Sequence, residues 1–410
     1  MSVLHPFRAL RPAPETAAAV SSVPYDVVSA DEARQLAAGN PLSFLHVTRA
    51  EIDLPASVDP YDDRVYAQAR ENLAALRARA PLVIDDSPSL YFYRLRMNGH
   101  EQTGIAGCFS VDEYEHDTIK KHERTRRDKE DDRTRHILEL RAQTGVVFLT
   151  YNATAAVDDL ARRVTAAAPL YDFSAADGVQ HTVWRAGADD TRALVGAFAG
   201  IPALYIADGH HRAASAARAR AELRSRNASD AAEAGTFIAV AFPHNQMQIL
   251  PYNRTVKDLA GRTPEQFLTA LRERFPVGTG ADVSATPRRK GEVSMYLAGR
   301  WHAIDLSRAA PPDASRASSL DVALLQHYVL EQILGIGDIR SDKRIDFVGG
   351  ARGTQALQQA VDSGKAAVAF SLFPVTIEDL MGISDAGGIM PPKSTWFEPK
   401  LRDGLLVHVI

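Results

Sequence analysis

The sequence predicts a mixed α/β (α+β) fold with partly antiparallel sheets. Apolar residues make up 45% and charged residues 24% of the 410 residues, as in an ordinary soluble globular protein. Helical and strand patterns alternate along the chain without a strict strand–helix–strand rhythm. An Asn98-Gly99 pair between two strand-like stretches predicts a hairpin, which requires antiparallel pairing. A chain of this length has room for two or three domains.

The first 141 residues carry clear local signals. Ser29 can cap a helix that stops at Gly39-Asn40-Pro41. Val65, Ala69 and Leu73 recur at helical spacing. Helices are therefore expected over residues 31–38, 62–79 and 128–141, and strands over 42–47, 89–96 and 102–111.

The rest of the chain continues this alternation. Gly145 to Tyr151 is an apolar run of strand length, and Thr376 with Asp379 forms a T-x-x-D cap at the start of a helix. Residues 390–397 are predicted to form a loop. Strands are expected over 145–151, 182–185, 201–207, 236–242, 366–373 and 404–410, and helices over 320–334, over 376–384 and from the 208–212 loop to about 226.

Composition shifts predict how these elements group. Residues 276–292 and 307–319 are rich in Gly, Pro, Ser and Ala and flank one short hairpin. We therefore expect four parts along the chain. They are an N-terminal α/β lobe at 1–111, a core at 112–275, a linker region with a hairpin at 276–319, and a C-terminal α/β lobe at 320–410 that packs on the core.

Charge and cysteine content exclude several classes of protein. The formal net charge is −4, which argues against a general nucleic-acid coat protein but leaves room for a local basic patch; nucleic acid is not expected as a partner. Cys108 is the single cysteine, which excludes an internal disulfide and a cysteine-rich zinc site. The N-terminus shows no secretory signal, and no run of about 18 apolar residues exists. We expect a cytoplasmic protein without a membrane partner.

Residues 205–215, Tyr-Ile-Ala-Asp-Gly-His-His-Arg-Ala-Ala-Ser, form the most informative segment. A strand ends, Gly209 allows a tight turn, and a helix begins. The first N–H groups of a helix lack acceptors, so such a terminus binds phosphate readily. Asp208 adds a hard oxygen suited to Mg²⁺. In the same reading, further donors for an oligophosphate come from His210, His211 and Arg212. The alternative reading is that Asp208 only caps the helix.

Residues 112–141 form a second candidate segment, in which 19 of 30 residues are charged, ten acidic and nine basic. Three of the nine lysines of the chain fall within 120–129. His122-Glu123 precedes the expected helix, where a carboxylate can face a cleft and act as a general base. The alternative is a solvated helix with i,i+4 ion pairs such as Asp131 with Arg135.

Two further segments offer substrate contacts. Asp26 follows Pro24-Tyr25 and either enters a site or belongs to a plain turn. The 391–396 segment, Pro-Pro-Lys-Ser-Thr-Trp, is either a binding loop or a connector. Its candidate side chains are one of the rare lysines and two hydroxyls, from Lys393, Ser394 and Thr395.

Four common catalytic or nucleotide-binding motifs are absent from the sequence. It contains no Walker-A loop, no G-x-G-x-x-G turn, no H-E-x-x-H helix and no G-x-S-x-G elbow. Cys108 lies in a strand without a basic neighbour in sequence, so we expect it in the core rather than as a nucleophile.

Several segments together resemble a bacterial and archaeal family called domain of unknown function 1015. They run from one end of the chain to the other, so the resemblance covers essentially the whole chain. The family name implies no activity. The segments are 24–29, 40–46, 121–125 with 129–133, 206–212 and 390–400.

The 208–212 loop is more distantly similar to the phosphate-binding loop of the ParB/sulfiredoxin-like superfamily. Free-serine kinases of that superfamily share the loop and an upstream His-Glu pair whose glutamate is the catalytic base. The resemblance implies a ParB/sulfiredoxin-like core at 112–275, with Glu123 and Asp208 as catalytic residues and Asp208 next to Mg²⁺. Sulfiredoxin chemistry requires a cysteine in this loop. Because position 210 is histidine, sulfiredoxin activity is excluded.

The expected function is phosphoryl transfer from ATP or ADP, with Mg²⁺, to a small hydroxylated metabolite, serine being the first guess. The alternatives are a ParB-type nucleotide-binding regulator without turnover, associated with DNA, and a simple interaction surface. Phosphate or nucleotide contacts are expected from Lys121, Arg124, Arg133, Gly209, His210, His211 and Arg212. Substrate contacts are expected from Asp26, Lys393, Ser394 and Thr395.

Overall fold

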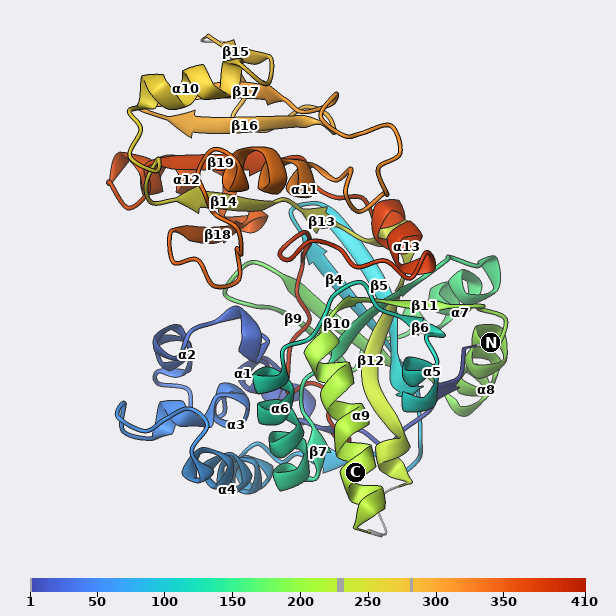
Figure 1. The fold of residues 1–410 in the computed structure, drawn as a ribbon. Helices are drawn as coiled ribbons and strands as arrows, with labels where there is room; N and C mark the ends of the chain where they lie inside the picture. The colour runs from blue at the N-terminus through green and yellow to red at the C-terminus, as the bar shows by residue number, and fades with distance from the viewer. Residues whose placement is uncertain (1, 227–231, 281–282) are drawn as a thin grey trace. The chain divides into compact units, whose positions relative to one another are not determined.

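The computed structural model describes residues 2–226, 232–280 and 283–410. The chain divides into two compact units, which are coloured by residue number in Figure 1. Unit 1 comprises Met1–Met247 and Pro399–Ile410, and unit 2 comprises Gln248–Glu398. Unit 2 is therefore an insertion within the sequence of unit 1. This grouping differs from the four parts expected from composition. The first 247 residues and the last 12 belong to the same unit, which a division along the sequence does not reveal.

Unit 1 contains most of the helices and the larger sheet. Its strands are β1 (Leu4–His5), β2 (Leu10–Arg11), β3 (Val83–Ile84), β4 (Tyr91–Met97), β5 (His100–Ser110), β6 (Ile119–Lys120), β7 (Ala142–Gln143), β8 (Val147–Tyr151), β9 (Tyr171–Ser174), β10 (Gln180–Arg185), β11 (Leu204–Asp208), β12 (Thr236–Pro243) and β21 (His408–Val409). Its α-helices are α1 (Ala17–Val20), α2 (Ala30–Ala37), α3 (Leu45–Thr48), α4 (Asp63–Arg79), α5 (Val111–Glu115), α6 (Arg127–Leu140), α7 (Ala155–Thr165), α8 (Ala188–Phe198) and α9 (His210–Ser225). Its 3-10 turns are η1 (Pro14–Thr16), η2 (Tyr25–Val27), η3 (Ala50–Asp53), η5 (Glu233–Gly235) and η6 (His244–Gln246).

The large sheet of unit 1 mixes parallel and antiparallel pairs, which confirms the predicted mixed α/β class. In the part of the chain that the structure describes, it has nine strands in the order β6-β11-β8-β12-β5-β4-β10-β9, with β1 paired to β5. β11 runs parallel to β6 and antiparallel to β8. The carboxyl ends of parallel strands meet at one edge of a sheet. The residues that follow β6 and those that follow β11 therefore lie close together.

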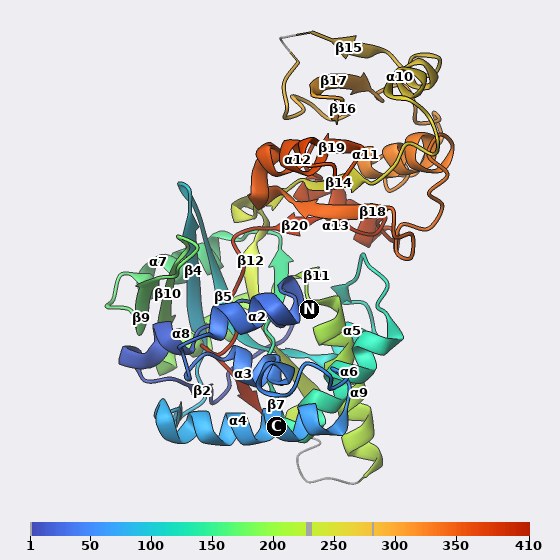
Figure 2. The same ribbon diagram turned by 90° about the vertical axis from the view of Figure 1, so that its left-hand side faces the viewer.

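Helices α7, α8 and α9 pack against this sheet. The main apolar core joins Leu160 of α7 and Phe198 of α8 to Leu149 of β8, all of them buried. α9 is buried along much of its length, and its small residues Ala213 and Ala216 let it lie close to the strands. α9 also packs along α6, and α6 packs on α4, as Figures 1 and 2 show from two sides.

Unit 2 is built on an antiparallel sheet. Its six strands within the described ranges follow the order β15-β17-β16-β19-β14-β18, and β13 pairs with β20. Residues 281 and 282 of the predicted linker lie outside the described residues. The strands are β13 (Ile249–Leu250), β14 (Tyr252–Val256), β15 (Val277–Thr279), β16 (Glu292–Leu297), β17 (Arg300–Asp305), β18 (Ile345–Gly349), β19 (Val368–Leu372) and β20 (Trp396–Phe397). The helices are α10 (Pro264–Arg272), α11 (Asp321–Leu325), π-helical η7 (Gln326–Glu331), 3-10 turn η8 (Gly350–Arg352), α12 (Gly353–Asp362) and α13 (Ile377–Asp385).

Most predicted elements are confirmed. Ser29 and Glu32 form a complete capping box on α2, and Asn98 and Gly99 take left-handed backbone angles between β4 and β5. The strand predicted over 42–47 is wrong, because the segment forms a turn followed by α3. A short apolar run fits a buried helix as well as a strand, and only its packing decides.

Two further predictions need correction. The strand expected over 404–410 shrinks to β21, which pairs with β7. The ion pair expected between Asp131 and Arg135 of α6 does not form. Asp131 bonds to Arg218 of α9 and Arg135 bonds to Asp63 of α4, so the charges of α6 tie neighbouring helices together. Among the described residues no helix combines the length and the apolar character needed to cross a bilayer.

Candidate functional site

The turn from β11 into α9 forms the centre of the site. Gly209 has φ 96° and ψ 30°, a left-handed conformation that side-chain-bearing residues rarely adopt. A Cβ atom there would lie 3.3 Å from Cδ of Arg212 and 3.4 Å from Cα of Val147. The first hydrogen bond of the helix runs from the N–H of Ala213 to the carbonyl of Gly209, at 3.1 Å. The N–H groups of residues 210–212 thus precede the helical ladder and carry the positive end of the helix dipole.

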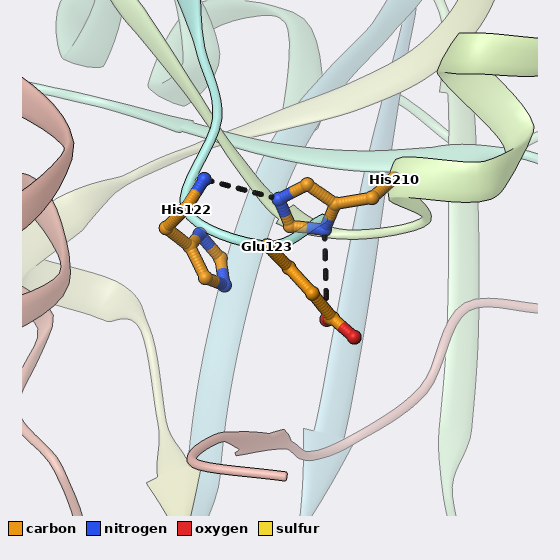
Figure 3. A group of neighbouring side chains, drawn as sticks. All are labelled: His122, Glu123 and His210. Carbon is orange, nitrogen blue, oxygen red and sulfur yellow. Dashed lines mark hydrogen bonds and ion pairs between the residues drawn. The ribbon is translucent and has the colours of Figure 1, made fainter. Parts of the chain in front are cut away.

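The segment that follows β6 brings His122 and Glu123 to this turn. Figure 3 shows the imidazole of His210 between the backbone of His122 and the carboxylate of Glu123. The backbone N–H of His122 donates to Nε2 of His210 at 3.4 Å, and Nδ1 of His210 lies 4.0 Å from Oε2 of Glu123. The two imidazoles are in edge-to-face contact, with ring centroids 4.4 Å apart. The side chain of Glu123 is 45% exposed, so its carboxylate is within reach of a ligand.

The hydrogen-bond pattern assigns the proton of His210. Because Nε2 accepts from a backbone N–H, the neutral ring carries its proton on Nδ1, the nitrogen that faces Glu123. His122, Glu123 and His210 also hold potential metal ligands within 4.8 Å of one another. A metal-bound histidine normally donates its second N–H to an acceptor, whereas here that nitrogen faces a donor. The pattern favours a hydrogen bond from His210 to a carboxylate or phosphate oxygen over metal binding.

Burial keeps the histidines of the site neutral. It lowers the pKa of His122 to about 4, an effect that nearby Asp208 only partly offsets. Burial, and then the neighbouring His122, hold the pKa of His210 well below its usual value. Burial also lowers the pKa of His211, whose Nε2 accepts from the backbone N–H of Arg126 at 3.0 Å. At neutral pH these rings are therefore neutral donors and acceptors rather than cations.

Arg212 is held by the protein itself. Its side chain is only 5% exposed, and Nη2 lies 2.7 Å from both carboxylate oxygens of Asp26. Nη1 donates to the carbonyl of Val146 at 2.7 Å. Burial opposes the charge of Arg212, but Asp26 and Asp208 outweigh it and raise its pKa. Asp26, expected to contact substrate, thus pairs with the arginine expected to contact phosphate.

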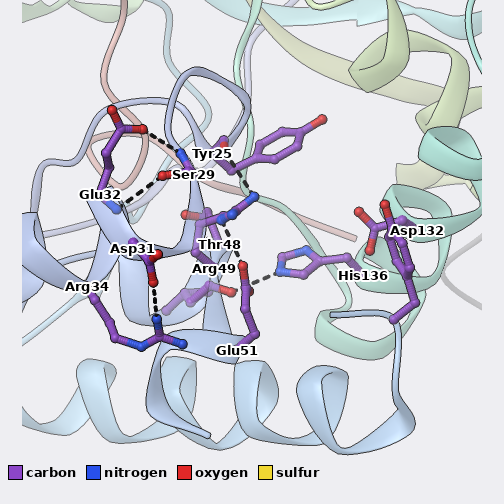
Figure 4. A network of polar contacts seen from close by, with 12 residues as sticks. Tyr25, Ser29, Asp31, Glu32, Arg34, Thr48, Arg49, Glu51, Asp132 and His136 are labelled. Atoms are coloured by element: carbon purple, nitrogen blue, oxygen red, sulfur yellow. Dashed lines mark hydrogen bonds and ion pairs between the residues drawn. The ribbon is translucent and has the colours of Figure 1, made fainter. Parts of the chain in front are cut away.

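The turn that carries Asp26 is fixed from below. Arg49 bonds to Glu51 at 2.9 Å and donates to the carbonyl of Tyr25 at 3.5 Å, as seen in Figure 4. The guanidinium of Arg133 stacks on the ring of Tyr25, with Cζ of Arg133 4.3 Å from the ring centroid. These contacts position the turn so that Asp26 pairs with Arg212 at the start of α9.

The other predicted cations differ in how strongly the protein holds them. Lys121 donates to the carbonyl of Tyr114 and pairs with Asp117, both at 2.6 Å. Arg133 pairs with the buried Asp132 at 2.8 Å. Arg124 is exposed and makes no hydrogen bond or ion pair with the described residues.

Two residues of the C-terminal segment complete the site, and no motif reading singled them out. Nζ of Lys400 lies 3.2 Å from Oδ2 of Asp208, and Nη2 of Arg212 lies 3.9 Å from the same oxygen. Burial disfavours the charge of Asp208, but these two cations outweigh it and keep its pKa below the usual range. Burial raises the pKa of Asp403, near Arg212, to about 7. In the sequence, Lys400 stands out only as one of the rare lysines and as the last residue of the 390–400 segment that resembles the family.

The remaining candidates belong to unit 2. Lys393 has a left-handed φ of 58°, and its ammonium lies 5.4 Å from the ring centroid of Tyr252. The hydroxyl of Ser394 donates to the carbonyl of Pro391 at 2.6 Å. Their predicted role in substrate binding, together with that of Thr395, stays a prediction.

The solved structures that match this chain are distant from it in both sequence and structure. SbnI from Staphylococcus aureus is 12% identical, with a TM-score of 0.39 over 74% of this chain and 87% of that one. A free serine kinase in complex with AMP is 12% identical, with a TM-score of 0.35 over 74% of this chain and 91% of that one. A conserved hypothetical protein from Pyrococcus furiosus is 14% identical, with a TM-score of 0.36 over 75% and 95%.

A comparison with curated protein sequences finds no match. The model of one protein family, described as protein of unknown function (DUF1015), matches residues 4–323. This range includes the β6–α6 segment and the β11–α9 turn. The chain is therefore a member of the DUF1015 family, as the sequence motifs predicted.

Proposed function

We propose that the protein is a nucleotide-dependent phosphotransferase that acts on a small hydroxylated metabolite, with serine as the first acceptor to test. One observation carries the proposal. The half-exposed carboxylate of Glu123 lies 4.0 Å from His210, the first residue of α9, at the helix terminus preceded by the Gly209 turn. A potential general base and an anion-binding terminus thus share one edge of the sheet.

In this proposal Glu123 accepts the proton of the acceptor hydroxyl. The hydroxyl oxygen forms a bond to the terminal phosphorus as the bond to the nucleotide leaving group breaks, and the proton ends on the carboxylate. His210 directs Nδ1–H toward Glu123 and so orients it. Because the imidazole is neutral, it does not neutralise the base. Positioning and electrostatics supply most of the catalysis in phosphoryl transfer.

The nucleotide phosphates would bind at the start of α9. Gly209 lets the backbone approach them, the N–H groups of residues 210–212 donate, and the exposed Arg124 adds charge. Arg212 would act mainly by fixing the loop through Asp26, since its terminal nitrogens are already engaged.

Asp208 fits a role as a Mg²⁺ ligand. Its Oδ2 faces Lys400 and Arg212, while Oδ1 makes no hydrogen bond or ion pair within the described chain. Mg²⁺ is commonly held by one or two carboxylates together with substrate phosphates. When bound, the ion would offset negative charge on the phosphate oxygens.

The test combines turnover and binding. Purified protein is incubated with ATP or ADP, Mg²⁺ and a panel of hydroxy amino acids that includes serine, and phosphorylated products are identified by mass spectrometry. Glu123→Gln should lower turnover by about 10²–10⁴-fold with nearly unchanged nucleotide affinity. The control Glu139→Gln, which removes an α6 carboxylate paired with Arg70, should leave turnover unchanged. Nucleotide binding without any product would refute the phosphotransferase and favour a regulator.

A further inference from the structure

The C-terminal segment of unit 1 delivers a cation to the candidate site. The chain re-enters unit 1 at Pro399, and nearly all residues from 401 to 410 are buried. Paired backbone hydrogen bonds join Asp403 to Ser22 and Val407 to Leu10. The segment is thus firmly held, and Lys400 lies at its start.

The ammonium of Lys400 lies beside the carboxylate that precedes the Gly209 turn. It is 3.2 Å from Oδ2 of Asp208, and the lysine side chain is only 15% exposed. Asp208 directly precedes the Gly209 turn. A phosphate at the start of α9 would therefore lie next to this ammonium.

Three of the cations nominated from sequence already have two partners each within the protein. Lys121, Arg133 and Arg212 are each bound to a carboxylate and to a backbone carbonyl. Guanidinium groups in such bidentate or stacked positions are fixed in plane. A lysine ammonium instead has three donors on a flexible stem and can turn from Asp208 toward a phosphate oxygen.

We propose that Lys400 binds the terminal phosphate groups of the nucleotide and that it contacts Asp208 when no nucleotide is present. The inference rests on the proposed function, because it assumes a nucleotide at the start of α9. It assigns a phosphate-binding role to a residue that is 192 positions away from Asp208 in the sequence.

The number of phosphates gives a sharp test. Affinities for adenosine, AMP and ADP are measured by isothermal titration calorimetry for wild type, Lys400→Gln and Lys400→Arg. Lys400→Gln should weaken ADP binding by about 10- to 100-fold, as expected for a lost charge-assisted hydrogen bond, and AMP binding by less. Adenosine binding should not change, and Lys400→Arg should recover part of the ADP affinity. The control is Lys290→Gln, which breaks a comparable lysine–aspartate pair (Lys290 with Asp379, 2.8 Å) within unit 2 and should have no effect.

The outcomes separate this inference from the proposed function. Equal losses for all three ligands would show a purely structural role for Lys400 and overturn the inference, as would unchanged ADP affinity in Lys400→Gln. If wild type binds ADP in a Lys400-dependent way but forms no product, the inference stands and the phosphotransferase fails. If wild type binds no ADP, both fail.

Discussion

The ion pair between Asp26 and Arg212 offers the most direct test of how the loop is held. Both carboxylate oxygens of Asp26 lie 2.7 Å from Nη2 of Arg212, and the guanidinium is buried. Asp26→Asn keeps the shape of the side chain and removes its charge. Two acids remain near Arg212, namely Asp208 at 3.9 Å and Asp403.

The expected cost follows from burial and from these remaining partners. Removing one member of a fully buried pair costs about 3–5 kcal/mol. Asp26 is 35% exposed and Asp208 still faces Arg212. We therefore expect Asp26→Asn to lower the free energy of unfolding by about 1.5–2.5 kcal/mol. Without the charge of Asp26, Asp403 ionises more easily and takes over as a partner. The double variant Asp26→Asn/Asp403→Asn loses this compensation and should exceed the sum of the single costs by about 1 kcal/mol or more.

The measurement is hydrogen–deuterium exchange of α9 peptides during urea denaturation, which reports on unit 1 specifically. Asp131→Asn is the control, because it breaks a more exposed ion pair, between Asp131 of α6 and Arg218 of α9, and should cost under about 0.5 kcal/mol. Additive costs in the double variant, within about 0.5 kcal/mol, would refute the view that Asp26 and Asp403 share one arginine.

Two further predictions concern the turn and the buried acid. Gly209→Ala forces alanine into a left-handed backbone conformation, which lowers stability by about 1–2 kcal/mol. It also places a Cβ atom 3.3 and 3.4 Å from neighbouring atoms. The melting temperature should therefore fall further than in Gly39→Ala, whose Cβ has no neighbour within 4 Å. Equal decreases would contradict this. Asp403, with its pKa raised by burial to about 7 from 3.8, binds a proton in the folded state that the unfolded chain releases. Its contribution to stability should therefore fall by up to about 1.4 kcal/mol per pH unit from about pH 4 to 7. The melting temperature of wild type relative to that of Asp403→Asn should therefore fall as pH rises from about 4 to 7, and a constant difference would contradict the assigned protonation.

Local signals in the sequence predicted much of the fold. The capping box of Ser29 and Glu32 and the hairpin turn at Asn98-Gly99 depend on residues within a few positions of one another. The segment 42–47 was predicted wrongly because its helical form depends on packing against distant residues.

The candidate site was only partly predictable for the same reason. The sharp turn at Gly209 follows from its own neighbours. The approach of Glu123 to His210 depends on the parallel pairing of β6 with β11, which a single sequence does not reveal. The partners of Arg212 and Asp208 lie 186 and 192 positions away, so the roles of Asp26 and Lys400 in the loop emerge only from the fold.

The return of residues 399–410 to unit 1 has a consequence for biosynthesis. The N-terminal part of unit 1 leaves the ribosome before roughly 150 residues of unit 2 are made. At synthesis rates of about 5–20 residues per second, it waits on the order of 10 s for Lys400 and Asp403. During that interval Asp208 and Arg212 lack these neighbours and the β7 edge lacks β21. The nascent chain therefore cannot assemble its complete loop until translation has passed the inserted unit.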